Sequence, residues 1–212
     1  MVPFSALGQE NLTILTEIME NTTWDIPLFE ALNFDGGRVV DQVMTAISGV
    51  VMWIPLYALI IYMVWRNYEW RGIVALIVAV AVAMGLADII AGIFKHSGPL
   101  QNLWADFPVR ERPMFNSLVE DVHVVSTKHG PFGTVSAHAA TIVSLAVIST
   151  IIVSRRWFTY TMVAVAVVIC YSRIYLACHF PQDILIGALL GIGSGFVGVW
   201  LFRRILTLWA KR

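Results

Sequence analysis

Charged side chains are scarce in this sequence, and this scarcity decides which solvent surrounds the chain. Of 212 residues, 13% are Asp, Glu, Lys or Arg, whereas 58% are hydrophobic. Soluble domains carry about 25% charged residues. The composition therefore excludes an ordinary soluble domain and predicts an integral membrane protein.

Cysteine is also rare, which excludes a disulfide framework. The two cysteines, Cys170 and Cys178, lie eight residues apart on one expected helix. At the helical rise this is about 12 Å, too far for a bridge within that helix. The sequence also lacks an internal repeat and a low-complexity tract, and residues 1–34 do not have the order of charge and hydrophobicity of a cleavable signal peptide.

Long apolar runs dominate what the sequence does contain. Crossing a bilayer core takes about 20 helical residues. Five stretches are long enough, at roughly 41–64, 71–94, 136–153, 157–178 and 184–205. The glycines of the GIGSGFVG run at 191–198 are typical of close packing between membrane helices.

The segment ahead of these stretches has a different pattern. Leu12, Leu15 and Ile18 recur at helical spacing with acidic residues between them, which predicts an amphipathic helix at the membrane surface. The expected fold is an all-α polytopic membrane bundle of five to six helices, including this N-terminal helix. Residues 1–34 form the interfacial segment and 35–212 the transmembrane domain.

Basic residues in the short loops predict the orientation. One face collects eight of them: Arg66, Arg71, Arg155, Arg156, Arg203, Arg204, Lys211 and Arg212. The other face, with the 95–134 loop, collects six. By the positive-inside rule the first face and the C-terminus are cytoplasmic.

Chemically active side chains gather on the opposite face. Because the spans alternate in direction, three clusters reach one membrane surface: Lys95 with Arg112; Ser136 with His138; and Arg173 with His179 and Asp183. Cations, a serine hydroxyl and helix N-terminal amides together favour phosphate. Two histidines beside such a site indicate a nucleophile and a separate acid.

These residues resemble the motifs of the type-2 phosphatidic acid phosphatases, membrane lipid phosphatases related to vanadium haloperoxidases. The third motif is complete as Ser172, Arg173, His179 and Asp183. The second is partial, because VSAH at 135–138 stands where the family has Pro-Ser-Gly-His. The first is stretched, with 16 residues between Lys95 and Arg112. The resemblance covers roughly residues 88–190.

The resemblance implies a mechanism through a phosphohistidine. His179 attacks phosphorus, Asp183 fixes the reactive tautomer of His179, and His138 protonates the leaving oxygen. Phosphate oxygens are bound by Lys95, Arg112, Ser136, the backbone N–H of Ala137 and Arg173. No metal or cofactor is implied.

Two positions stay open. Arg110 is the alternative to Arg112 in the phosphate cage, because the 95–134 active-site loop is longer than the family pattern. Asp88 lies two helical turns before Lys95 and either orients that lysine or forms part of a polar interior. A metal site at Glu120, Asp121 and His123 lacks helix-supported ligand spacing and is not expected.

The resemblance implies a lipid phosphate as substrate, with membrane lipids as further partners and no nucleic acid. The substrates considered are phosphatidic acid, phosphatidylglycerol phosphate and the 1-phosphate of lipid A. The expected location is a bacterial inner membrane with the site facing the periplasm. Undecaprenyl pyrophosphate hydrolysis, a lipid phosphotransferase and a non-catalytic transporter or scaffold are the alternatives. Oligomeric state is left open.

Overall fold

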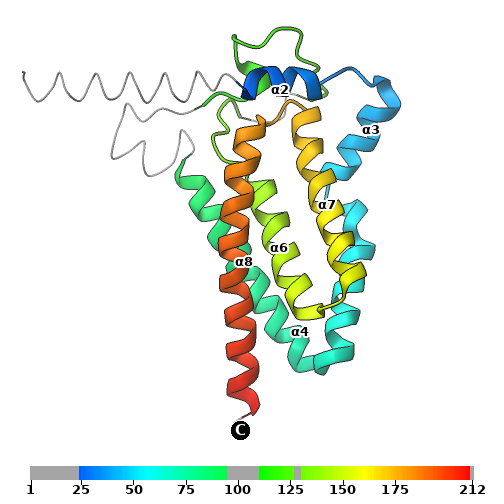
Figure 1. The fold of residues 1–212 in the computed structure, drawn as a ribbon, viewed down its shortest axis with the longest axis vertical. Coiled ribbons are helices and arrows are strands. Elements are labelled where there is room, and N and C mark those ends of the chain that lie inside the picture. Colours follow the sequence, from blue (N-terminus) through cyan, green and yellow to red (C-terminus); the bar gives the residue numbers. More distant parts are fainter. Residues whose placement is uncertain (1–23, 95–109, 127–129, 211–212) are drawn as a thin grey trace, which may run out of the picture.

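A computed structural model shows a bundle of antiparallel helices capped at one end by a short crosswise helix (Figure 1). It describes residues 24–94, 110–126 and 130–210. The helices are α2 (Asp25–Leu32), α3 (Gly37–Ser48), α4 (Ile54–Ile93), α6 (Ala137–Val153), α7 (Arg156–Tyr175) and α8 (Pro181–Ala210). The described ranges contain no β-strand, only an isolated bridge between Glu111 and Phe132. The all-α prediction is confirmed.

Helix α4 is two helices joined by a sharp reversal. Glu69 at the reversal has φ 56° and ψ −156°, and Figure 1 shows the two halves of α4 forming a V at the end far from α2. The halves of α4, together with α6, α7 and α8, run along the bundle. By length and composition, Val51–Ile93, Arg156–Tyr175 and Pro181–Ala210 are able to cross a membrane, and Ala137–Val153 is a shorter apolar helix.

The structure interrupts the first predicted span. The stretch 41–64 is not one helix, because α3 ends at Ser48 and a 3-10 turn, Val51–Trp53, precedes α4. Gly49 is extended at the C-cap of α3, and Pro55 lies in the first turn of α4. Glycine weakens a helix interior and proline favours a helix start. These two residues therefore divide the stretch that its hydropathy predicts to be one continuous span.

Small residues let α8 pack closely on α6. A methyl group added at Gly187 would lie 2.4 Å from the carbonyl oxygen of Ser136, and one at Gly191 would lie 2.4 Å from that of Ala140. Such contacts forbid any side chain larger than hydrogen unless the helices separate. The packing role predicted for the glycines at 191–198 is confirmed for Gly191, Gly195 and Gly198, whereas a methyl group at Gly193 would meet no atom within 4 Å. The close packing sets the N-termini of α6 and α8 side by side.

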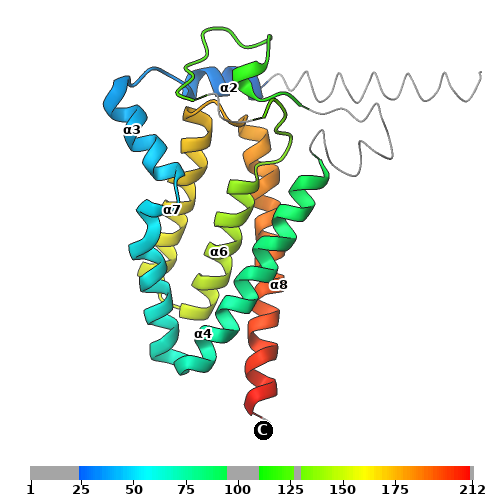
Figure 2. The same ribbon diagram turned by 180° about the vertical axis from the view of Figure 1, so that it is seen from behind.

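The end of the bundle next to α2 holds the chemically active motifs. The N-termini of α6 and α8 and the C-terminus of α7 meet there, whereas the α4 reversal, the α6–α7 link and the C-terminus lie at the other end (Figures 1 and 2). Helix α2 lies across the bundle in the direction expected of an interfacial helix. The predicted amphipathic spacing at Leu12 to Ile18 lies outside the described residues.

Candidate active site

The turn between α7 and α8 carries His179. Ala177, with φ 52°, reverses the chain after α7, and the Cys178 N–H donates to the Arg173 carbonyl at 2.9 Å. Pro181 then begins α8, as its preset φ favours. The side chain of Asp183, at the third position of α8, accepts from the Phe180 N–H at 3.1 Å. This is the contact from N3 to the N-cap residue in a capping box.

The two ring nitrogens of His179 have opposite surroundings. Nδ1 lies 3.1 Å from the Gly133 carbonyl oxygen and 3.3 Å from Asp183 Oδ2, so it carries the proton and donates. Nε2 lies 3.1 Å from Arg112 Nη1 and accepts, because a guanidinium only donates. This tautomer leaves the Nε2 lone pair on the side of the cations.

The electrostatic surroundings keep the His179 ring neutral. His179 is buried, and burial, followed by the charges of Arg112 and Arg173, holds the pKa of His179 well below its usual range. A neutral imidazole retains a nucleophilic lone pair in mildly acidic solution.

Backbone oxygens hold Arg112 against His179. Its Nε donates to the Gly130 carbonyl and its Nη1 to the Cys178 carbonyl, each at 2.8 Å. The side chain also packs on Gly133, where an added methyl group would lie 2.9 Å from Arg112 Cγ. Gly133 therefore both accepts from His179 and leaves room for the arginine.

Arg110 occupies a different position from Arg112. Its guanidinium forms an ion pair with Asp25 of α2, lies 3.8 Å from Asp183 Oδ1 and covers the Phe180 ring at 3.7 Å. Of the two arginines left open by the sequence, the structure brings Arg112 to the Nε2 side of His179 and Arg110 to the far side of Asp183.

Arg173 is buried at the end of α7. Its Nη1 donates to Ser48 Oγ at the end of α3. Its Nε has no hydrogen-bond partner within the described residues. A buried guanidinium N–H without a protein acceptor suits an anionic ligand.

The N-terminus of α6 contributes the second motif. Ser136 is the N-cap and accepts from the Ala139 N–H, while its own N–H donates to the Asp183 carbonyl at 3.1 Å. Ala137 and His138 follow in the first turn and line a cavity of about 260 Å³ together with Ser48 and Asp88. Most other lining residues are apolar.

Lys95 and Asp88 are the remaining predicted positions. Lys95 lies outside the described residues. Asp88 lines the same cavity as His138, among mostly apolar residues, and its predicted relation to Lys95 stays a prediction.

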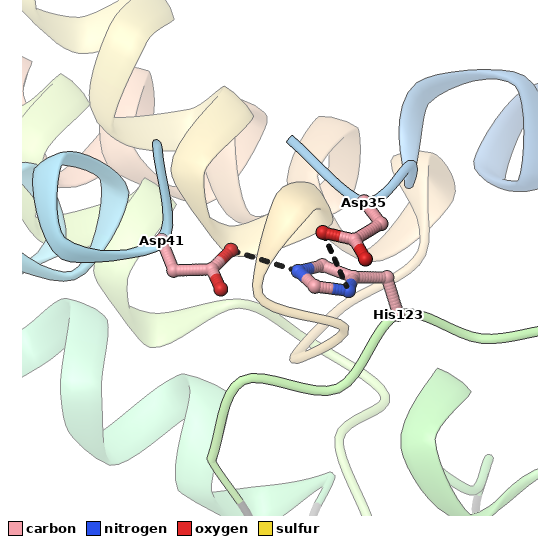
Figure 3. Close-up of side chains that lie close together, drawn as sticks. All are labelled: Asp35, Asp41 and His123. Carbon is pink, nitrogen blue, oxygen red and sulfur yellow. Dashed lines mark hydrogen bonds and ion pairs between the residues drawn. The ribbon is translucent and has the colours of Figure 1, made fainter. Parts of the chain in front are cut away.

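A second histidine cluster lies near the active-site end of α7. Figure 3 shows the His123 ring between Asp35 and Asp41, with one nitrogen directed to each carboxylate. Nε2 is 2.8 Å from Asp41 Oδ1 and Nδ1 is 3.8 Å from Asp35 Oδ1. One ligand atom from each of Asp35, Asp41 and His123 lies within 4.8 Å of the other two, and the His123 ring lies between the two acids. Neither Glu120 nor Asp121 joins this cluster among the described residues.

Comparison with known families decides the identity. A model of the PAP2 superfamily matches residues 73–206, more than half of the chain. This chain belongs to the PAP2 superfamily. The family resemblance inferred from the three motifs is confirmed.

Individual relatives extend this finding. A lipid A 4'-phosphatase from Bacteroides thetaiotaomicron is 34% identical over 165 residues, which cover 76% of this chain and 68% of the relative. An undecaprenyl-diphosphatase from Sulfolobus acidocaldarius is 24% identical over 183 residues, which cover 85% of this chain and 79% of the relative. The crystal structure of Aquifex aeolicus LpxE matches in fold with a TM-score of 0.60 at 21% identity, covering 85% of this chain and 98% of that one. These matches support the general class of integral membrane lipid phosphatase for this PAP2 chain.

Several residues that contact His179, Arg173, Arg110 or Arg112 were not predicted from the sequence. They are Gly133, Ser48, Asp25 and the backbone carbonyl of Cys178. The glycine three residues before Ser136 was the one local signal, because a glycine close to a phosphate motif often permits a close approach. Ser48 and Asp25 come from helices outside the motifs, and nothing in their local sequence marks them.

Proposed function

We propose that this PAP2 chain is a metal-independent lipid phosphatase acting through a phosphohistidine at His179. The observation that supports the proposal best is the orientation of the His179 ring. Its Nδ1 is held by the Gly133 carbonyl and Asp183 while its Nε2 faces Arg112. Nε2 attacks phosphorus in line, the P–N bond forms, and the P–O bond to the lipid breaks.

His138 completes this step on the leaving-group side. It gives a proton to the lipid oxygen as the P–O bond breaks, because an alkoxide is a poor leaving group. In the second step it takes a proton from water, which attacks phosphorus and releases inorganic phosphate and free His179. Asp183 stabilises the positive ring of the intermediate through Nδ1.

The phosphate cage supplies the charge that such a transition state needs. Arg112 and Arg173 are its cations, with Lys95 as a third, and Ser136 and the Ala137 N–H provide hydrogen bonds from the start of α6. The buried Nε of Arg173, unpaired among the described residues, is one donor available for a phosphate oxygen. These groups neutralise the oxygens over which charge spreads in phosphoryl transfer.

The substrate proposed first is a lipid A phosphate, with the 4'-phosphate as the leading candidate. The support is the 34% identity to a lipid A 4'-phosphatase and the largely apolar cavity beside His138. Undecaprenyl pyrophosphate is the second candidate, supported by the relative named an undecaprenyl-diphosphatase. Phosphatidic acid and phosphatidylglycerol phosphate share the same reacting group and belong in the same panel.

The proposed orientation places the site at the periplasmic side of a bacterial inner membrane. The segments with Arg66, Arg71, Arg155 and Arg156 lie at the end of the bundle opposite α2. By the positive-inside rule that end faces the cytoplasm.

Phosphate release from these four lipid phosphates, measured in detergent with EDTA, tests the proposal. The parent is compared with His179→Ala and His138→Ala. Release by the parent and not by His179→Ala supports the mechanism, and the preferred lipid identifies the substrate class. Activity that EDTA abolishes, or that His179→Ala retains, contradicts it.

A further inference from the structure

Helix α2 brings a buried carboxylate to the active-site end of the bundle. Asp25 is fully buried at the first turn of α2, although this helix lies outside the family match at 73–206. Its Oδ1 accepts from the Gln182 N–H at the start of α8, at 2.9 Å. Asp25 is thus attached to the same helical turn that carries Asp183.

The other oxygen of Asp25 forms an ion pair with Arg110. The same guanidinium nitrogen lies 3.8 Å from Asp183 Oδ1. Arg110 is therefore shared unequally between two buried carboxylates, with the closer contact to Asp25. Asp183 keeps its second oxygen, Oδ2, for the Nδ1 of His179 and the Phe180 N–H.

The backbone around Arg110 is coupled to the same site. The Arg110 N–H donates to Thr134 Oγ1 at 3.2 Å, and the Gly133 N–H donates to the Arg110 carbonyl at 3.0 Å. Gly133 in turn provides the second acceptor for His179 Nδ1. Both acceptors of the His179 proton therefore contact Arg110.

We propose that Asp25 is a positioning residue for catalysis, acting through Arg110 on Asp183. This inference rests on the proposed phosphohistidine mechanism. Asp25 draws the Arg110 charge toward α2 and so prevents a close ion pair between Arg110 and Asp183. Without Asp25 the guanidinium moves onto Asp183, because a buried arginine without a paired carboxylate is costly in free energy.

A close Arg110–Asp183 pair weakens catalysis in a specific way. The His179 ring gains positive charge when its Nε2 bonds to phosphorus, and Asp183 stabilises that charge through Nδ1. An Asp183 neutralised by Arg110 stabilises it less. The loss falls on the chemical step, whereas the phosphate contacts of Arg112 and Arg173 stay in place.

Asp25→Asn in the full chain tests the inference. Rates of lipid phosphate hydrolysis in detergent give kcat and KM. Inhibition by inorganic phosphate measures how tightly the phosphate cage binds its ligand. We expect kcat to fall about tenfold, as for other partners that orient a catalytic ligand, with KM and phosphate inhibition little changed. Asp25→Glu is expected to recover part of the rate. Glu30→Gln, an exposed carboxylate of α2, is the matched control and keeps the parent rate.

Arg110→Gln, alone and combined with Asp25→Asn, provides an independent check. The double variant is expected to lose no more than Arg110→Gln alone, because Asp25 acts through that arginine. Additive losses overturn the inference. A parent-like kcat in Asp25→Asn also overturns it, as do parallel losses of kcat, phosphate inhibition and melting temperature. If the parent itself releases no phosphate, the proposed function fails, which is a different result.

Discussion

Two histidines of this chain each lie beside an aspartate, and they differ in what faces the second ring nitrogen. His179 donates through Nδ1 toward Asp183, and its Nε2 faces Arg112. His123 directs Nε2 to Asp41 and Nδ1 to Asp35. The first ring has an acid on one side and a cation on the other, whereas the second has an acid on both sides.

Because of this difference, we expect only His179 to lie beside a bound phosphate. The phosphate site proposed above lies on the cationic side of His179, where Nε2 carries its lone pair and accepts from Arg112. The carboxylates around His123 repel a phosphate. Asp41 is hydrogen-bonded to Nε2, and Asp35 lies 3.8 Å from Nδ1. His123 instead joins the loop after Arg112 to α3 through Asp41 and to the linker before α3 through Asn33. Tyr175 donates a further hydrogen bond to Asp41 at 2.7 Å.

The largest expected difference is between alanine variants of the two histidines. His179→Ala removes the proposed nucleophile, and we expect lipid phosphate hydrolysis to fall by about 10⁴-fold or more. His123→Ala is expected to keep the rate within a few-fold. Initial rates in detergent at equal folded protein measure both. Equal losses in the two variants contradict the assignment.

The partner aspartates provide the second comparison. Asp183→Asn keeps the shape of the side chain but removes the carboxylate that accepts from His179 Nδ1, and we expect kcat to fall about 10²–10⁴-fold. Asp41→Asn changes the partner of His123 and is the control, expected near the parent rate. A parent-like kcat in Asp183→Asn would show that the Gly133 carbonyl alone orients His179.

Arg112→Gln removes the cation that faces Nε2 of His179. We expect a rate loss of about 10²-fold, as for other groups that stabilise transition-state charge. The low pKa of His179 arises from burial and then from Arg112 and Arg173, so removing Arg112 raises this pKa. Because the neutral ring is the active form in the proposed mechanism, the acid limb of kcat/KM is expected to move to higher pH.

A pH profile of kcat/KM for Arg112→Gln and the parent measures this shift. Arg38→Gln, at an exposed arginine of α3, is the control and leaves the limb in place. An acid limb that stays fixed in Arg112→Gln would show that this cation does not act on His179 in the free enzyme.

The smallest effect is expected from the packing that encloses His179. Gly187→Ala places a methyl 2.4 Å from the Ser136 carbonyl, and overpacking of this kind costs about 1–3 kcal/mol. Gly193→Ala meets no atom within 4 Å and is the control. Melting temperature in detergent and phosphate release measure the two variants. Equal stability would mean that α6 and α8 separate without cost.

Local spacing allowed part of the site to be predicted from the sequence. His179 and Asp183 lie four residues apart across a helix start with Pro181 in its first turn, so one short segment determines their proximity. Hydropathy likewise predicts the apolar helices, because a bilayer sets their length and composition. It did not reveal the break at Gly49, since apolar residues continue on both sides of it.

The sequence by itself determined that this chain is a helical membrane protein and which residue types form its motifs, because these follow from composition and from neighbours along the chain. Only the tertiary structure placed Arg112 beside Nε2 of His179 and Arg110 beside Asp25 and Asp183. It alone brought Asp25, Ser48 and Gly133 to this end of the bundle. These contacts join segments separated by long stretches of sequence. They depend on how the helices pack and where the loops between them turn, and no periodicity or spacing encodes that arrangement locally.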